Sequence, residues 1–304
     1  MFLRGIHQLA LLIFVSSIVL FSETDETNTL HRPFFERVLK LQTMNWYTNS
    51  TSELIQKKYP GSWVDQTPKN KVRYFFVPDH ESKRQFLAFR WTANLMNAWV
   101  DLNFRRVYDP TLDTWVHNGV NLAAKEVMGR LLGRLIPEYD LVITGHSMGG
   151  SIALVLAMHM VKADYPLSQV VTFGQFRITN RAGTMKWKDL PYIRVAAEKD
   201  YVTWLPPTWL TGYHHFGKNL KLIGDTQYRF LVPGEANMLD NLAGSHPEIV
   251  IETWERVRQE ANPGLESPLP EIQSVWGPGH DLDNYIRKLA VIAAGFPEAE
   301  MARK

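Results

Sequence analysis

A serine between two glycines is the residue best placed to do covalent chemistry in this chain. It lies in the segment LVITGHSMGGSIAL (141–154), where an apolar, β-branched run precedes Gly145-His146-Ser147-Met148-Gly149 and a helix-like stretch follows. Strand, Gly-x-Ser-x-Gly and helix in that order form a nucleophile elbow. The helix after such a turn directs amides and the positive end of its dipole toward developing negative charge. The segment therefore predicts Ser147 as a nucleophile; the alternative is a tight turn that happens to contain serine.

An activated serine also needs a base and an acid. The base takes the hydroxyl proton, and the acid orients the base. After an elbow, the order along the chain is serine, acid, histidine. The acid is expected just past a later strand, and the strand-like segment Tyr192–Ala197 is followed by Glu198 and Asp200. Asp200 is favoured because a proline-containing loop leads away from it, and Glu198 is the reserve candidate. The alternative is a solvated loop carboxylate.

The histidines that follow Asp200 are His214, His215, His246 and His280. The last of them stands in the glycine-rich loop Gly277-Pro278-Gly279-His280-Asp281, just before a terminal helix pattern. Loops of this kind present catalytic residues over a rigid scaffold. We therefore favour His280 as the base, with the His214–His215 pair as the alternative. His146, inside the elbow, is expected to be structural and to direct its side chain away from the nucleophile.

Strand and helix patterns alternate around these residues. The expected strands are Lys71–Val77, Arg84–Phe89, Asp140–Thr144, Gln169–Phe173, Tyr192–Ala197, Lys218–Ile223 and Tyr228–Val232. The expected helices are Arg32–Tyr47, Trp91–Phe104, Gly119–Ile136, Ser151–Lys162, Pro247–Glu260 and Tyr285–Ala294, with a loop at Asn262–Pro270. This alternation predicts an α/β protein with a mainly parallel, doubly wound sheet and helices on both faces. No repeat or linker is found, so we expect a single domain over residues 23–304.

The composition excludes several other chemistries. The 33 basic residues nearly balance the 31 acidic ones, so a basic surface for nucleic acid or an anionic membrane is not indicated. The absence of cysteine excludes disulfides, thiolate metal sites and cysteine nucleophiles. No His-Glu-x-x-His or His-x-x-Glu-His spacing is present, so a metal-dependent hydrolase is disfavoured and no metal or cofactor is expected. The composition gives no oligomeric state.

The first residues have the features of an export signal. Arg4 supplies a positive charge, the uncharged apolar run Leu9–Phe21 follows, and a polar stretch begins after Ser22. This run is short for a membrane span but suits a secretory signal. Leu20, three residues before a cut after Ser22, is larger than the residue that signal peptidase prefers there. Residues 1–22 are therefore predicted to be a signal peptide or an uncleaved N-terminal anchor, and the protein to be periplasmic or secreted.

Several segments between Lys71 and Tyr285 resemble the class 3 lipases, α/β-hydrolases typified by fungal triacylglycerol lipases. They are ITGHSMGGSIA (143–153), VVTFGQFRITN (170–180), EKDYVTWLPP (198–207), GHDLDNY (279–285) and VHNGV (116–120). The resemblance implies the α/β-hydrolase fold and the triad Ser147, Asp200 and His280. AFRWT (88–92) resembles the family's Phe-Arg-Gly-Thr or Ser. It implies an oxyanion hole formed by Thr92 and the amide of Met148, a pairing that agrees with the usual chemistry.

The chain departs from the family pattern at three places. Trp91 stands where the family has glycine, Phe176 stands where it usually has proline, and residues 225–275 have no counterpart that we place. The segment TANLMNAWVDL (92–102) occupies the position of the family's lid helix. Its apolar face, Leu95, Trp99 and Leu102, is expected either to contact a lipid interface or to pack on the core as an ordinary helix.

Together these patterns predict a serine ester hydrolase that acts on lipid or other carboxylic esters through an acyl-enzyme. Lipase, esterase and phospholipase activities all fit this chemistry. The alternative is a non-catalytic lipid-binding or scaffold protein that keeps the fold but has its site blocked, for example by Trp91, because a fold alone does not establish a function.

Overall fold

The computed structural model describes residues 30–90, 105–232, 277 and 279–296. The chain divides into two compact units, Met1–His31 and Arg32–Lys304. Nearly all of the first unit, including the expected signal or anchor at residues 1–22, lies outside the described residues. Within the described ranges, we find no helix with the length and apolarity needed to cross a membrane.

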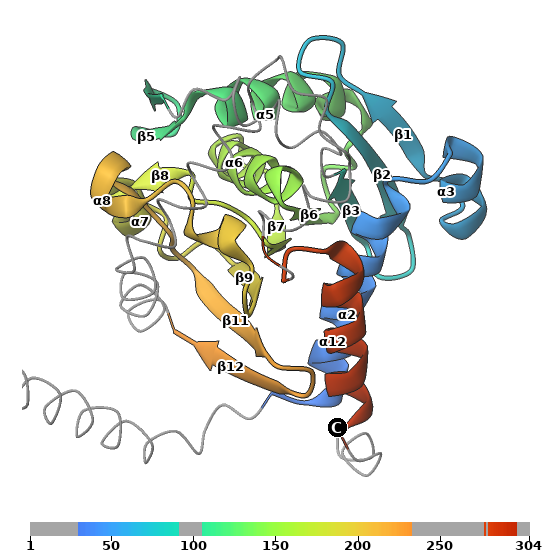
Figure 1. Ribbon diagram of the computed structural model, residues 1–304. Helices are drawn as coiled ribbons and strands as arrows, with labels where there is room; N and C mark the ends of the chain where they lie inside the picture. Colours follow the sequence, from blue (N-terminus) through green and yellow to red (C-terminus); the bar gives the residue numbers. More distant parts are fainter. Residues whose placement is uncertain (1–29, 91–104, 233–276, 278, 297–304) are drawn as a thin grey trace, which may run out of the picture. The chain divides into compact units, whose positions relative to one another are not determined.

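An eight-stranded sheet, in the order β1-β2-β3-β6-β7-β9-β11-β12, forms the centre of the second unit (Figure 1). Its strands are β1 (Trp63–Gln66), β2 (Arg73–Asp79), β3 (Arg84–Phe89), β6 (Asp140–His146), β7 (Leu167–Phe173), β9 (Tyr192–Ala197), β11 (Lys218–Ile223) and β12 (Gln227–Leu231). The inner pairs from β3 to β11 are all parallel, and the outer pairs are antiparallel. The sheet is therefore mainly parallel, as the sequence predicted.

Helices cover both faces of this sheet. They include α2 (Arg32–Tyr47), α5 (Asn118–Leu131), α6 (Met148–Lys162) and α12 (Leu282–Ala294). Alternate side chains of a strand point to opposite faces. In β6, Leu141 and Ile143 belong to the same buried cluster as residues of α5 and α6, whereas the Thr144 hydroxyl accepts a 3.0 Å hydrogen bond from Asn45 of α2. On the α2 face, α12 lies alongside α2 (Figure 1).

A second, smaller sheet has the strand order β10-β8-β5-β4. Its strands are β4 (Arg106–Asp109), β5 (Thr114–His117), β8 (Thr179–Asn180) and β10 (Tyr213–His214). β8 follows β7, and β10 follows β9, so this sheet is built on loops that leave the carboxyl ends of the parallel strands. The sequence did not predict it, because strands of two to four residues are too short to show a period.

Short helices and turns complete the described structure. They are α3 (Ser52–Lys58), η1 (Leu132–Arg134), α7 (Arg181–Lys186), η2 (Tyr201–Trp204) and α8 (Thr208–Thr211). The expected bounds hold for α2, β3, β9 and β11. The helix expected over 119–136 ends at Leu131 and continues as η1, where Gly133 weakens helix formation. The helices expected at 91–104 and 247–260 and the loop at 262–270 lie outside the described residues.

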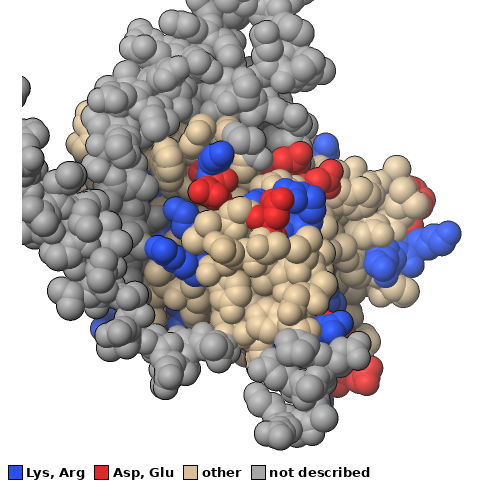
Figure 2. Space-filling view, turned by 60° about the horizontal axis from the view of Figure 1, so that its bottom comes forward, with Lys and Arg blue, Asp and Glu red and all other residues tan. Residues whose placement is uncertain are grey.

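Charges of both signs are interspersed on the face shown in Figure 2, where tan surface separates small groups of red and blue side chains. This mixture agrees with the near balance of 33 basic and 31 acidic residues.

Candidate active site

Ser147 forms the turn between β6 and α6. The strand ends at His146 and the helix begins at Met148. Ser147 has φ 56° and ψ −126°, a conformation that costs a non-glycine residue energy and persists only where its surroundings impose it. The Ser147 amide donates a 2.8 Å hydrogen bond to the carbonyl oxygen of Phe173 in the neighbouring strand β7. The local structure is therefore that of the predicted elbow.

Two glycines allow strand and helix to approach each other at this turn. A Cβ on Gly145 would lie 2.6 Å from the backbone nitrogen of Gly150. A Cβ on Gly149 would lie 2.7 Å from the carbonyl oxygen of Arg90, just past the end of β3. Real Cβ atoms do not approach backbone this closely. Side chains at either position would force the helix away from the strands that flank the serine.

Three residues that are distant in sequence form one chain of hydrogen bonds. Ser147 Oγ lies 3.0 Å from Nε2 of His280, and Nδ1 of His280 lies 2.9 Å from Oδ1 of Asp200. The exposed fractions of Ser147, His280 and Asp200 are 0%, 5% and 1%. A hydrogen bond from Nδ1–H to a carboxylate leaves Nε2 as the acceptor that faces the serine hydroxyl. The structure thus brings together the three residues that the sequence favoured.

The Asp200 carboxylate is held by further donors. The Val202 amide donates to Oδ1 over 3.1 Å, and the Tyr285 hydroxyl donates to Oδ2 over 2.6 Å. The Tyr285 oxygen also accepts a 2.9 Å hydrogen bond from the Ala197 amide at the end of β9. Burial, and then the Asp200 charge, raise the pKa of the Tyr285 hydroxyl well above its usual value, so it stays a protonated donor. Sequence reasoning assigned Tyr285 no role, although its place in the first turn of the helix after His280 was an available signal.

Glycines also dock the His280 loop on the Asp200 loop. A Cβ on Gly279 would lie 2.6 Å from the Asp200 amide nitrogen, and one on Gly277 would collide with the Lys199 carbonyl. Across the site, a Cβ on Gly174 would lie 2.7 Å from Oδ2 of Asp200 and 3.1 Å from Nδ1 of His280. Backbone packed against backbone in this way fixes the position of the imidazole.

Residues 86–209 match the family model described as lipase (class 3). A lipase from Rhizomucor miehei is 32% identical over 149 residues, which are 45% of this chain and 41% of the relative. Secreted mono- and diacylglycerol lipase 1 from Fusarium solani is 26% identical over 184 residues, 58% of this chain and 55% of the relative. The chain thus spans about half the length of these curated relatives. The resemblance to the class 3 lipase family is confirmed.

A solved structure, Lip2 lipase from Yarrowia lipolytica, matches 72% of this chain and 93% of its own with a TM-score of 0.58 and 19% identity. This similarity shows the α/β-hydrolase fold. The class 3 lipase match contains Ser147 and Asp200 but ends before His280, so the place of His280 beside Ser147 comes from the distances in the structure.

The alternative acid and base residues lie elsewhere. The Glu198 carboxylate accepts a hydrogen bond from the Gly224 amide at the exposed end of β11. His215 is buried and donates from Nε2 to the Thr203 carbonyl over 2.6 Å, and His214 lies in β10 of the small sheet.

The ring of His146 packs on that of His280, with centroids 4.9 Å apart. Burial, together with the nearby His280, lowers the pKa of His146 well below its usual value. Its imidazole is therefore a neutral neighbour of His280.

Only part of the expected oxyanion hole falls within the described residues. Met148 is the first residue of α6, so its amide belongs to the positive end of that helix. Thr92 and the departure Trp91 lie outside the described residues, as do the lid positions Leu95, Trp99 and Leu102. His246 is outside them as well.

Proposed function

We propose that this chain is a serine hydrolase of carboxylic esters, with Ser147 as nucleophile, His280 as general base and Asp200 as the residue that orients the base. His280 Nε2 takes the proton of Ser147 Oγ as the oxygen attacks the acyl carbonyl carbon. The imidazolium then gives that proton to the departing alcohol, leaving the acyl group on Ser147. Water, deprotonated by the same nitrogen, attacks this ester and releases the acid and free serine.

The observation that carries this proposal is the hydrogen-bonded chain from Ser147 through His280 to Asp200, at 3.0 and 2.9 Å. The strained backbone of Ser147 also supports the proposal, because strain of this kind is found mainly at functional sites. During attack, negative charge develops on the substrate's carbonyl oxygen. We assign its stabilisation to the amide of Met148 at the start of α6 and to Thr92.

Lipid esters are the proposed substrate class. The relatives named above include a lipase and a secreted mono- and diacylglycerol lipase, and a plant relative is named phospholipase A1. Leu95, Trp99 and Leu102 are the proposed contacts with a lipid interface. The apolar N-terminal run and the secreted relative together support export, with residues 1–22 as the signal and residues 23–304 as one hydrolase domain.

Two measurements on the full-length chain test the activity. A fluorophosphonate probe should label the wild-type chain and fail to label Ser147→Ala, because only an activated serine reacts readily with it. Hydrolysis of p-nitrophenyl butyrate and palmitate should fall by at least about a thousandfold in Ser147→Ala. Ser151→Ala, in the next turn of α6, is the matched control and should keep both properties. Equal rates in wild type and Ser147→Ala would refute the mechanism. Folded wild type that neither labels nor hydrolyses would favour the lipid-binding alternative.

A further inference from the structure

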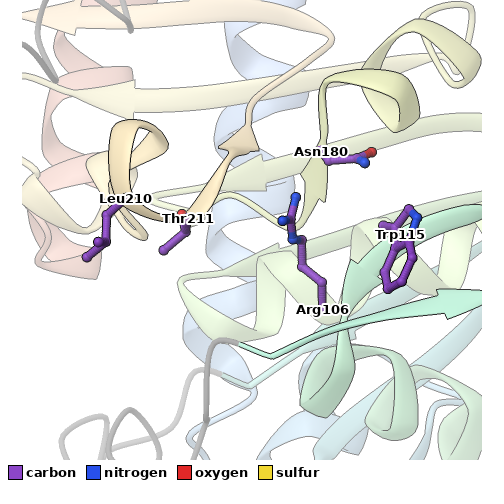
Figure 3. Close-up of a pocket in the computed structure, with 5 residues that line it drawn as sticks. All are labelled: Arg106, Trp115, Asn180, Leu210 and Thr211. Carbon is purple, nitrogen blue, oxygen red and sulfur yellow. The ribbon is translucent and has the colours of Figure 1, made fainter.

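A pocket of about 480 Å³ lies beside the small sheet. Its lining residues are Arg106, Trp115, Asn180, Leu210 and Thr211. Figure 3 shows the guanidinium of Arg106 standing between Thr211 on one side and Trp115 on the other, with Asn180 above Trp115. The walls come from β4, β5, β8 and α8. A basic group thus occupies the middle of a pocket that has both polar and apolar walls.

This pocket is built on the same loops as the candidate active site. Asn180 follows β7 through the segment that contains Gly174, and Thr211 follows Asp200 through η2 and α8. Arg177 joins these two loops, since its Nη1 donates a 3.1 Å hydrogen bond to the carbonyl oxygen of Pro206. Both loops leave the carboxyl edge of the parallel strands, where Ser147 also lies. The pocket and the candidate triad are therefore joined through these two loops.

The polar groups of the pocket offer donors to an anion. The Arg106 guanidinium lies 5.6 Å from the centroid of the Tyr213 ring, and no carboxylate among the described residues pairs with it. Asn180 Oδ1 accepts the Gly183 amide of α7 over 2.9 Å, so its Nδ2 group is left as a donor. A planar guanidinium with an amide donor beside it matches the several oxygens of a phosphate.

The electrostatic surroundings have the same sign. Burial lowers the pKa of His214, which lies next to Tyr213 in β10, and the positive charges of Arg177, Arg181 and Arg106 lower it further. The groups that shift this histidine by charge are therefore all cations. Of these three arginines, Arg106 lines the pocket, and the positive charge around His214 favours an anion over a cation in this part of the small sheet.

Two of the lining side chains are apolar, Trp115 and Leu210. Trp115 is 46% exposed and Leu210 is 62% exposed, and the neighbouring Trp209 is 58% exposed. A small soluble anion makes no favourable contact with apolar walls. An amphiphile places a charged head and a hydrocarbon portion side by side, and this arrangement suits it.

We propose that this pocket is a subsite for the phosphate-bearing headgroup of a lipid ester, which makes an anionic phospholipid the preferred substrate of the hydrolase. The assignment rests on the proposed function, because a headgroup subsite has a use only where the acyl ester is cleaved. Arg106 and Asn180 bind the phosphate oxygens, and Trp115 and Leu210 contact the adjoining glycerol and acyl carbons.

Binding is measured by calorimetry with the full-length Ser147→Ala chain, which leaves the ligand intact. The probes, used below micelle-forming concentrations, are decanoylglycerol phosphate, decanoylglycerol, decanoate and inorganic phosphate. We expect the phosphate amphiphile to bind most tightly and Arg106→Gln to weaken it by about tenfold or more. Asn180→Asp keeps an oxygen to cap α7 but places a negative charge at the subsite, so it should also weaken binding. Arg229→Gln, an exposed arginine on β12, is the control of equal charge and should bind as before.

Several results overturn the assignment. One is equal binding before and after Arg106→Gln, and another is an equal loss in Arg229→Gln. Tight binding of decanoate would show a carboxylate site, and binding of inorganic phosphate as tightly as the amphiphile would show a site for free phosphate.

Hydrolysis by the chain with Ser147 intact separates this proposal from the proposed function. Arg106→Gln should lower kcat/KM for the phospholipid by a much larger factor than kcat/KM for diacylglycerol. Absence of hydrolysis with binding intact refutes the hydrolase and not the phosphate site.

Discussion

Replacement of Tyr285 by phenylalanine tests how the candidate site is held together. The change removes a single oxygen from a buried ring whose hydroxyl donates to Oδ2 of Asp200 and accepts from the Ala197 amide. A hydrogen bond to a charged group contributes about 1.5–3 kcal/mol, and a buried donor left without a partner costs about 1–3 kcal/mol. Because these effects overlap, we expect Tyr285→Phe to lower the free energy of unfolding by about 2–4 kcal/mol.

Activity should fall as well, because Asp200 then holds His280 less firmly. A loss of about 1.4 kcal/mol in transition-state stabilisation corresponds to a tenfold decrease in kcat/KM. Urea unfolding gives the first quantity, and hydrolysis of p-nitrophenyl butyrate, with the rate of fluorophosphonate labelling, gives the second. Tyr139→Phe is the matched control, because it removes a hydroxyl that bonds to His80 on the exposed surface. A Tyr285→Phe chain with the stability and labelling rate of the Tyr139→Phe control would refute the reasoning.

Two further predictions concern a glycine beside the triad and a buried histidine in the small sheet. Gly174→Ala places a Cβ 2.7 Å from Oδ2 of Asp200 at a residue with φ +56°, so it should abolish esterase activity. The control Gly61→Ala also has a positive φ, +78°, but open space around its Cβ, so it should keep the activity. An active Gly174→Ala chain would contradict this reasoning. Burial lowers the pKa of His117 from 6.5 to about 4, so the unfolded chain binds a proton that the folded chain does not as pH falls below 6.5. The contribution of neutral His117 to the free energy of unfolding is therefore fully present above pH 6.5. This contribution, about 3 kcal/mol at most, is lost as the pH falls toward 4. Urea unfolding of wild type and His117→Gln between pH 7 and pH 4.5 checks this, and identical pH profiles would exclude His117 as the cause.

Much of the main sheet was predictable because its strands are long and buried. β3 and β9 have the expected bounds, since each is a mostly apolar stretch that a charged residue, Arg90 or Glu198, follows. The small sheet was not predictable. The two residues of β8 and the two of β10 are strands only because Thr179 pairs with Val116 and with His214, partners that are distant in sequence.

The candidate site divides in the same way. Ser147 was visible because its whole context, strand, turn and helix, is local. Asp200 and His280 were candidates by their order and loop type, but other residues fitted as well, and only the distances among the three distinguish them. Tyr285 and the glycine contacts at Gly174 and Gly279 act through space, on residues far away in the chain. No local pattern indicates such contacts.

The distance between nucleophile and base along the chain has a consequence during synthesis. Ser147 and His280 are separated by 133 residues. The loop of His280 leads into α12, which packs beside α2, the first helix of the second unit along the chain. A nascent chain whose C-terminal segment is still inside the ribosome can form the elbow but has no base for it. Contacts between such distant segments also form slowly. The proposed esterase activity would therefore begin only after translation has passed α12.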